Sequence, residues 1–275
     1  MIAMQAQLVF YSDNELLEGP IFDSSNNLLY FVSIFEGLVY CYEPATKKIL
    51  SVRLDSPVSN VYLKDHKKVI AASKNGFYEV DFNTLQASFV FQIDIEDDMR
   101  FNDGIEDAKG RFLIGTMGYP DVLPNRGKVF SFYEGKYEVI IENTTISNGL
   151  AFSRDNTLLY FIDTPSKKVV KYAYNLNTGD VTFEASVIEF KENGSPDGMC
   201  MDNNGNLWIA EWGGSCVSLW SPYSGKKLQV LELPCPNVTS CTFDDKGGMY
   251  VTTAKSDDQD NNLGGGLFYF ENNNF

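Results

Sequence analysis

The stretch SPDGMCMDNNGNLWIAEWGG, residues 195–214, decides the fold of this 275-residue chain. It opens with a Pro-Asp-Gly turn, continues as a short apolar strand and an Asp-Asn-Asn-Gly turn, and ends in a strand rich in Leu, Trp and Ile. The same order of turn, strand, turn and strand recurs clearly at residues 18–34, 102–117 and 147–164, and more weakly at 59–73 and 239–254. Repeats of this kind are typical of β-propellers.

Each repeat places one residue at the mouth of its first strand, and these positions are roughly 41 to 49 residues apart, in the range of propeller blades. They are Glu18, Ser59, Asn102, Asn148, Asp197 and Thr239. A further alternating run follows each repeat, at residues 37–42, 76–82, 127–132, 168–174, 216–220 and 265–270. The pattern predicts an all-β fold, a six-bladed β-propeller with four antiparallel strands per blade.

The two ends of the chain suggest how the ring closes. Residues 6–11 alternate like a strand but precede the first repeat, whereas the last repeat offers only three strands. The N-terminal strand is therefore expected to join the last blade and to remove the exposed edges. Because the repeat uses the whole length, residues 1–275 are expected to form a single β-propeller domain.

The composition excludes several classes of partner. A net charge of −15 argues against a surface for DNA, RNA or anionic membranes, which need clustered Lys and Arg. No apolar run approaches the length of a membrane span, and no signal peptide is visible. Five cysteines without CxxC spacing favour free thiols in a reducing compartment. These features predict a cytoplasmic protein that binds neither nucleic acid nor membranes. A monomer or weak homo-oligomer is expected.

Residues at equivalent blade starts converge in a propeller, because the first strands line the central channel. Glu18, Asn148 and Asp197 would then meet on the axis, where two carboxylates need a compensating cation. Oxygen donors without His or Cys favour Ca²⁺, Mg²⁺ or Mn²⁺. The alternative is that Asn148 and Asp197 serve only their turns, since Asn and Asp before Gly suit tight turns. Glu18 has no such turn preference.

Several segments resemble the regucalcin, gluconolactonase and luciferin-regenerating enzyme family, which also includes senescence marker proteins. They are EGPIFD (18–23), RFNDGIEDAKGRFLIGTM (100–117), ISNGLAFSRDNTLLYFIDTPS (146–166), PDGMCMDNNGNLWIAEWGG (196–214) and LPCPNVTSCTF (233–243). The resemblance implies a propeller with one divalent cation on its axis. Ca²⁺ is the expected ion, with Zn²⁺, Mg²⁺ and Mn²⁺ as alternatives, and Glu18, Asn148 and Asp197 are the implied metal ligands.

The same resemblance implies a metal-dependent lactonase that opens small sugar-type lactones. Asp197 would position or deprotonate the attacking water, and Arg100 and Asn102 would bind substrate. Tyr119 stands where animal members of the family carry an acidic residue, and it is expected beside the substrate. Ser33 is a second departure, because many members have Asp there. Two alternatives stay open: a non-catalytic calcium-binding propeller, and a metal-dependent phosphoester or organophosphate hydrolase.

Overall fold

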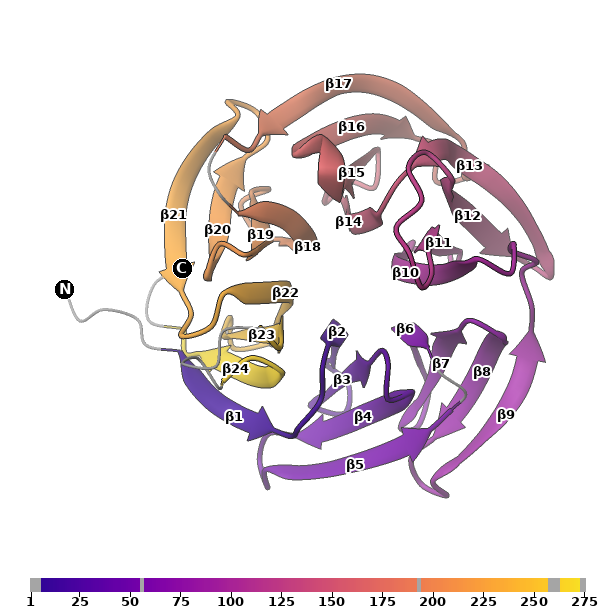
Figure 1. Ribbon diagram of the computed structural model, residues 1–275, viewed down its shortest axis with the longest axis vertical. Coiled ribbons are helices and arrows are strands. Elements are labelled where there is room, and N and C mark those ends of the chain that lie inside the picture. The colour runs from indigo at the N-terminus through magenta and orange to yellow at the C-terminus, as the bar shows by residue number, and fades with distance from the viewer. Residues whose placement is uncertain (1–5, 55–56, 192–193, 257–262, 273–275) are drawn as a thin grey trace.

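The computed structural model describes residues 6–54, 57–191, 194–256 and 263–272. Antiparallel sheets stand around a common axis in a propeller (Figure 1). Within these ranges the only helical element is a 3-10 turn, η1 (Thr164–Ser166). The described part of the chain has no helix with the length and hydropathy needed to cross a bilayer. The all-β propeller prediction is confirmed.

Four sheets are four-stranded meanders, in which each strand pairs with the next along the chain. The first is β2 (Leu17–Asp23), β3 (Leu28–Ser33), β4 (Leu38–Glu43) and β5 (Lys48–Arg53). The second is β6 (Val58–Lys64), β7 (Lys68–Ser73), β8 (Gly76–Asp81) and β9 (Gln86–Phe91). The third is β10 (Met99–Glu106), β11 (Phe112–Gly118), β12 (Gly127–Tyr133) and β13 (Lys136–Thr144). The fourth is β14 (Ser147–Phe152), β15 (Leu158–Asp163), β16 (Lys168–Tyr174) and β17 (Val181–Glu189).

The remaining strands form one eight-stranded sheet, which corrects the prediction of six separate blades. One half is β18 (Ser195–Met201), β19 (Leu207–Trp212), β20 (Cys216–Ser221) and β21 (Lys226–Glu232). The other half is β22 (Asn237–Phe243), β23 (Met249–Ala254), β24 (Gly266–Phe270) and β1 (Gln7–Tyr11). Trp212 and Asn237 form the only residue pair between the described parts of β19 and β22. This pair lies at two strand ends, where the repeat pattern carries no information about pairing.

The predicted role of the N-terminal strand is confirmed. β1 runs antiparallel to β24, with Gln7 opposite Tyr269 and Tyr11 opposite Gly266. Figure 1 shows β1 beside β24, at the point where the first and last parts of the chain meet. The first strand thus supplies the fourth strand of the last half-sheet and covers an edge that would otherwise be open.

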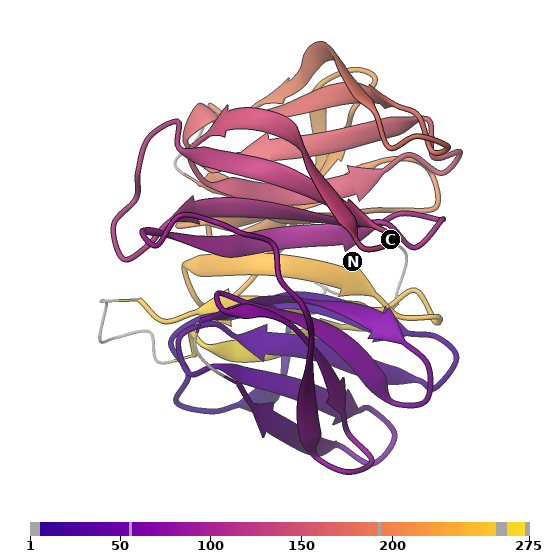
Figure 2. The same ribbon diagram turned by 90° about the vertical axis from the view of Figure 1, so that its right-hand side faces the viewer.

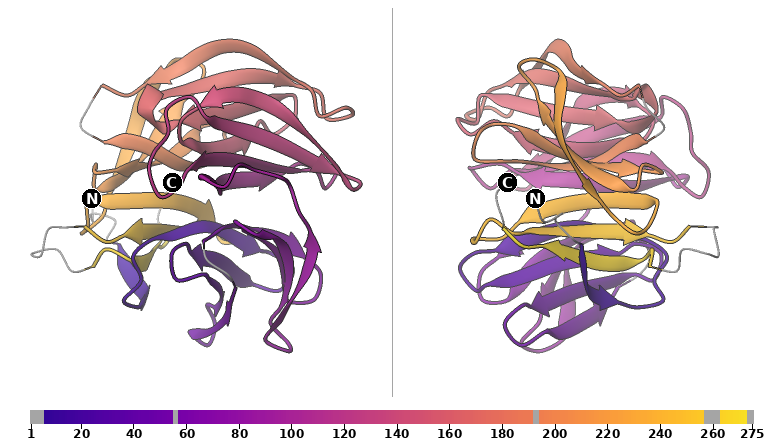
Figure 3. Two further views of the ribbon diagram at one scale, coloured as in Figure 1. Left: turned by 45° about the vertical axis from the view of Figure 1, so that its right-hand side comes forward. Right: turned by 90° about the vertical axis from the view of Figure 1, so that its left-hand side faces the viewer.

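Burial changes from the axis outward in each sheet. All six residues of β3 are buried, whereas β9, an outer strand, is exposed along almost its whole length. The core lies between neighbouring sheets, where apolar faces pack together. Phe91 and Phe132, from adjacent sheets, stack with ring centroids 3.6 Å apart. Strands run from one face of the ring to the other, so the connecting loops gather at the two faces (Figures 2 and 3).

The Asp-led turns of the repeat are held by the aspartate side chain. Oδ1 of Asp202 accepts hydrogen bonds from the backbone N–H groups of Asn204 and Asn206, at 2.7 and 2.9 Å. Oδ1 of Asp244 accepts equivalent bonds from Lys246 and Gly248, both at 2.8 Å. These side-chain bonds fix the hairpins between first and second strands. They explain why the turn is the clearest signature in the sequence.

Candidate metal and substrate site on the ring axis

Each inner strand of the ring carries a register shift close to its first residues. The shifts lie at Glu18/Ile21, Val58/Asn60, Phe101/Gly104, Asn148/Leu150, Pro196/Met199 and Val238/Ser240. A bulge leaves one residue unpaired and redirects neighbouring side chains. Each inner strand therefore bends at or beside its predicted axial residue, which is how a regular meander can place polar groups at its inner end.

Glu18 and Asp197 are buried carboxyl groups from distant repeats that interact with each other. Burial raises the pKa of Glu18 to about 8, with a further rise from Asp103. Burial also raises the pKa of Asp197 well above its usual value, and the charges of Glu18 and Asp103 add to the effect. Arg100 acts in the opposite direction on both groups. The structure thus brings the two predicted acidic ligands into one buried group of carboxyl side chains.

A chain of hydrogen bonds joins the predicted substrate residues to the predicted ligand Asn148. Nη1 of Arg100 donates to Oδ1 of Asn102 at 2.7 Å. Nδ2 of Asn102 donates to Oδ1 of Asn148 at 3.3 Å, and Nδ2 of Asn148 donates to Oγ1 of Thr164 at 3.1 Å. The last bond fixes which way the Asn148 amide faces, so its oxygen lies on the side of Asn102.

Arg100 is a buried cation in this group, only 5% exposed. Burial lowers the pKa of Arg100 to about 10, while the charges of Glu18, Tyr119 and Asp197 oppose that change. A second bond from Nη1, to the carbonyl oxygen of Phe101 at 2.9 Å, holds the guanidinium in place. Arg100 is therefore a buried, hydrogen-bonded cation and not a solvated surface charge.

Tyr119 lies at the edge of the same group, close enough to Arg100 to affect the pKa of the guanidinium through its charge. Its ring stacks on Phe35, with centroids 6.3 Å apart and planes at 22°. Nζ of Lys74 lies 5.4 Å from the centroid of the Tyr119 ring. Loops after β3, β7 and β11 thus meet in an aromatic ledge, defined here as Phe35 and Tyr119, with Lys74 beside it.

Two polar residues of the site were not found from the sequence. The charge of Asp103 raises the pKa values of Glu18 and Asp197. Burial raises the pKa of Asp103 itself to about 6. Asn60 donates from Nδ2 to Oδ1 of Asp103 at 3.2 Å and to the carbonyl oxygen of Gly104 at 2.8 Å.

In a regular strand the side chains of Asn102 and Asp103 would face opposite sides of the sheet. The bulge between Phe101 and Gly104 removes that restriction, and the sequence carries no signal for it.

The other two predicted axial positions have structural roles. Oγ of Ser59 donates to the carbonyl oxygen of Ala72 at 3.3 Å. Oγ1 of Thr239 donates to the carbonyl oxygen of Leu17 at 2.7 Å and thereby ties β22 to β2. Both hydroxyls are buried and engaged with backbone. They therefore hold neighbouring strands in place.

The donor set fits a hard divalent cation. In the part of the chain that the structure describes, Oδ1 of Asp197 is buried and has no hydrogen-bond partner. Such an oxygen is costly unless a cation or proton compensates it. Among the described residues no three His, Cys, Asp or Glu side chains form a metal-binding group. The candidate site combines the carboxylates of Glu18 and Asp197 with the Asn148 amide oxygen, a mixture of donors that Ca²⁺ accepts.

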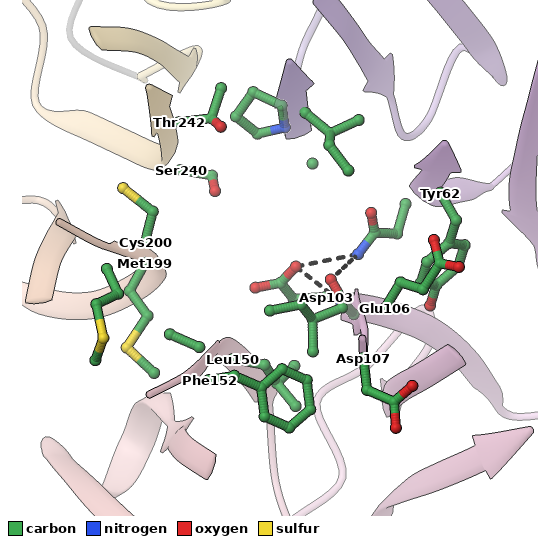
Figure 4. A pocket seen from close by; sticks show the side chains of 18 of the residues that line it. Tyr62, Asp103, Glu106, Asp107, Leu150, Phe152, Met199, Cys200, Ser240 and Thr242 are labelled. Carbon is green, nitrogen blue, oxygen red and sulfur yellow. Dashed lines mark hydrogen bonds between the residues drawn. The ribbon is translucent and has the colours of Figure 1, made fainter. Parts of the chain in front are cut away.

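A cavity of about 560 Å³ runs along the inner strands beyond the bulges (Figure 4). At one end it is lined by Asp103 and Asn60, and at the other by turn residues such as Ser153. Its walls are largely apolar and sulfur-containing, with Leu150, Phe152, Met199 and Cys200 labelled in Figure 4. Asp103 thus belongs both to the acidic group and to the end of this cavity.

Known proteins resemble this chain in sequence and in fold. A family model described as SMP-30/Gluconolactonase/LRE-like region matches residues 16–255. Regucalcin from Xenopus laevis is 34% identical over 263 residues, which cover 92% of this chain and 88% of regucalcin. The putative sugar lactone lactonase YvrE from Bacillus subtilis is 33% identical over 245 residues, covering 86% of this chain and 82% of YvrE. The solved structure of a calcium-binding protein, regucalcin from Agrobacterium tumefaciens, superposes on this chain with a TM-score of 0.90 at 24% sequence identity. The match covers 98% of this chain and 94% of the regucalcin chain, and it supports the fold.

Proposed function

Because the chain belongs to the SMP-30/gluconolactonase/LRE-like family, we propose that it is a divalent-metal-dependent hydrolase that opens small, sugar-type lactones. One observation carries the proposal. The buried carboxyl groups of Glu18 and Asp197, whose pKa values are raised, share the axis with Asn148 and the guanidinium of Arg100. The name of the B. subtilis relative, a putative sugar lactone lactonase, supports the substrate class.

Glu18, Asn148 and Asp197 would hold the cation, for which Ca²⁺ is our first choice. All three offer oxygen donors, and Ca²⁺ tolerates a flexible set of carboxylate and amide oxygens completed by water. When bound, the ion would supply Lewis acidity toward the lactone carbonyl. Zn²⁺, Mg²⁺ and Mn²⁺ are the alternatives that metal analysis would distinguish.

Asp197 is proposed as the catalytic residue that orients the attacking water or takes its proton. Its Oδ1 is buried and unpartnered within the described chain, so it can receive a water hydrogen. Water attacks the carbonyl carbon, the ring C–O bond breaks, the proton lost by the water passes to the ring oxygen, and a hydroxy acid leaves. A carboxylate that also binds a cation has a lowered pKa, so Asp197 would contribute mainly by positioning the water.

Arg100, Asn102 and Tyr119 are proposed to bind the substrate. Arg100 and Asn102 are held in place by their mutual bond, and preorganised polar groups lose little freedom when they bind hydroxyl groups. The aromatic ledge would contact an apolar part of the lactone. A ledge of this kind favours lactones that are less fully hydroxylated than gluconolactone.

We further propose that residues 1–275 act as one domain in the cytoplasm, as a monomer or weak homo-oligomer. The five cysteines are free thiols, which agrees with a reducing compartment. The eight-stranded sheet places two inner strands, β18 and β22, at the axis. It would therefore contribute to the site as two repeats do.

The decisive experiment measures metal content and proton release together. Purified protein would be analysed for bound metal and then assayed in a pH-stat with D-glucono-1,5-lactone, before and after EDTA. Turnover that chelation abolishes and Ca²⁺ restores is the expected result. Bound cation without turnover of any lactone in a panel would indicate a non-catalytic calcium-binding propeller. Turnover of p-nitrophenyl phosphate or an organophosphate alone would indicate a metal-dependent phosphoester or organophosphate hydrolase.

A further inference from the structure

Two cysteines from neighbouring inner strands meet at the wall of the central cavity. Sγ of Cys200, on β18, lies 3.6 Å from Sγ of Cys241, on β22. Both are free thiols, and both line the cavity of about 560 Å³ shown in Figure 4. They belong to different halves of the eight-stranded sheet. Neither residue has a place in the proposed metal or substrate site.

The backbones of β18 and β22 approach closely beside this pair. A Cβ atom added at Gly198 would lie 2.6 Å from Cβ of Ser240 and 2.9 Å from the carbonyl oxygen of Thr239. Only a glycine fits between the strands at that point. Cys200 follows Gly198 by two residues and Cys241 follows Ser240 directly, so the close approach extends to the thiols.

We propose that Cys200 and Cys241 form an oxidative modification site, at which a peroxide or a low-molecular-weight disulfide converts the two thiols into a disulfide that ties β18 to β22. A disulfide needs an S–S distance of about 2.0 Å, so the sulfurs, now 3.6 Å apart, must approach by about 1.6 Å. Side-chain rotation can supply much of that movement. The cavity gives a small oxidant a route to both sulfurs.

The chemistry balances with either oxidant. Hydrogen peroxide oxidises one thiol to a sulfenic acid and releases water, and the second thiol then displaces a second water as the S–S bond forms. Two thiols thus lose two hydrogen atoms, and one peroxide becomes two waters. A low-molecular-weight disulfide first forms a mixed disulfide and is finally released as two thiols.

The environment of the two cysteines determines how fast their thiols are oxidised. The Cys241 thiol, burial and the carboxylate of Asp202 all raise the pKa of Cys200. Since the thiolate is the reacting form, oxidation should be slow at neutral pH and faster in alkali. The bond would close a loop of the chain that begins three residues after Asp197. Chain-entropy arguments give a rise in Tm of roughly 5–15 °C for a loop of this length.

The test uses the full-length protein under native conditions. Samples would be treated with hydrogen peroxide or oxidised glutathione at pH 7 and pH 9, and then examined by intact mass and non-reducing peptide mapping. The expected product has lost two hydrogen atoms, contains a linked Cys200–Cys241 peptide pair, and has a higher Tm. A reducing agent should reverse all three changes. Cys200→Ser and Cys241→Ser should each prevent them, whereas Cys235→Ser should not.

Three outcomes would overturn the proposal. They are a disulfide that forms only after denaturation, oxidation that stops at a sulfinic acid on Cys200, and linkage to a different cysteine. If a serine variant fails to fold, the test uses the wild-type protein, in which the number of thiols open to alkylation is measured before and after oxidation. Native oxidation should then protect two thiols, assigned by mapping, from later alkylation under denaturing conditions. Protection of any other pair would contradict the proposal as well.

Discussion

Asn102 donates a hydrogen bond from Nδ2 to Oδ1 of Asn148 across 3.3 Å, and thereby connects the β10 sheet to the β14 sheet at the axis. The same Nδ2 also donates to the carbonyl oxygen of Ser147 at 2.9 Å. A residue proposed to bind substrate thus also orients a proposed metal ligand. Cation affinity and substrate binding are therefore expected to depend on each other through this amide.

The first prediction concerns that amide. Asn102→Ala should reduce both cation affinity and kcat/KM by about 10–100-fold, the usual cost of losing a partner of a metal ligand. Calorimetric titration with Ca²⁺ and steady-state kinetics would measure the two effects. Asn204→Ala, in an exposed turn, is the matched control and should change neither. A loss of kcat/KM with unchanged cation affinity would show that Asn102 does not position Asn148.

The second prediction separates substrate binding from cation binding. Arg100→Met should lower kcat/KM by about 10–100-fold, mainly through KM, because a buried charge-assisted contact is lost. Cation affinity should stay the same or increase, since Arg100 opposes the negative charge of Glu18 and Asp197. Arg154→Met is the control, because Arg154 is bonded to Asn203 in the turn region at the other end of the cavity. Equal losses of cation affinity and activity would count against the assignment.

The third prediction concerns stability without metal. The pKa of Glu18 is raised from 4.5 to about 8 in the folded protein, so the folded state holds a proton that the unfolded state releases. This stabilisation is fully present below pH 4.5 and is lost as the pH rises through 8. In EDTA, Tm should therefore fall between pH 5 and pH 8, and saturating Ca²⁺ should remove most of the fall.

Glu18→Gln provides the control for that slope, because it keeps the shape and removes the charge. The variant should lose much of the pH dependence in EDTA and should no longer be stabilised by Ca²⁺. A constant Tm of the metal-free wild type across this range would show that ionisation of Glu18 does not destabilise the fold. The electrostatic argument that the site needs a cation would then be wrong.

Much of the ring could be predicted because its signals are local. The Asp-led turns and the apolar strands recur in the sequence, and the orphan strand at residues 6–11 indicated where the ring closes. The acidic pair Glu18 and Asp197 followed from counting equivalent positions. Each of these features is encoded in short segments that repeat along the chain, so even the distant pair Glu18 and Asp197 follows from the repeat.

The parts that escaped prediction depend on tertiary geometry. Asp103 was missed because a bulge, which has no signature in RFND, turns two consecutive residues toward the axis. The eight-stranded sheet was missed because Trp212 and Asn237 pair at strand ends. Phe35 and Lys74 reach Tyr119 from loops of other sheets, and nothing in their own segments indicates a shared site.

The fourth prediction tests the aromatic ledge. Phe35→Ser and Tyr119→Ser should each lower kcat/KM for δ-nonalactone, relative to gluconolactone, by about tenfold, the usual effect of losing apolar contact in a pocket. Competition assays with both lactones would give the ratio directly. Tyr223→Ser is the control, because Tyr223 is 81% exposed. An unchanged ratio in both variants would remove the ledge from substrate selection.

The last prediction concerns the backbone that positions Asp197. A Cβ atom added at Gly149 would lie 2.6 Å from the carbonyl oxygen of Asp197 and 2.7 Å from Cδ1 of Ile162. Gly149→Ala should therefore push β18 away from β14, destabilise the protein by about 1–3 kcal/mol, and weaken cation binding. Gly135→Ala is a suitable comparison, because its Cβ would meet nothing within 4 Å while its φ of +77° strains any other residue. Strain of that kind costs about 1–2 kcal/mol. Similar losses of Tm in the two variants, with cation affinity lost only in Gly149→Ala, would show that the close approach of the two strands places Asp197.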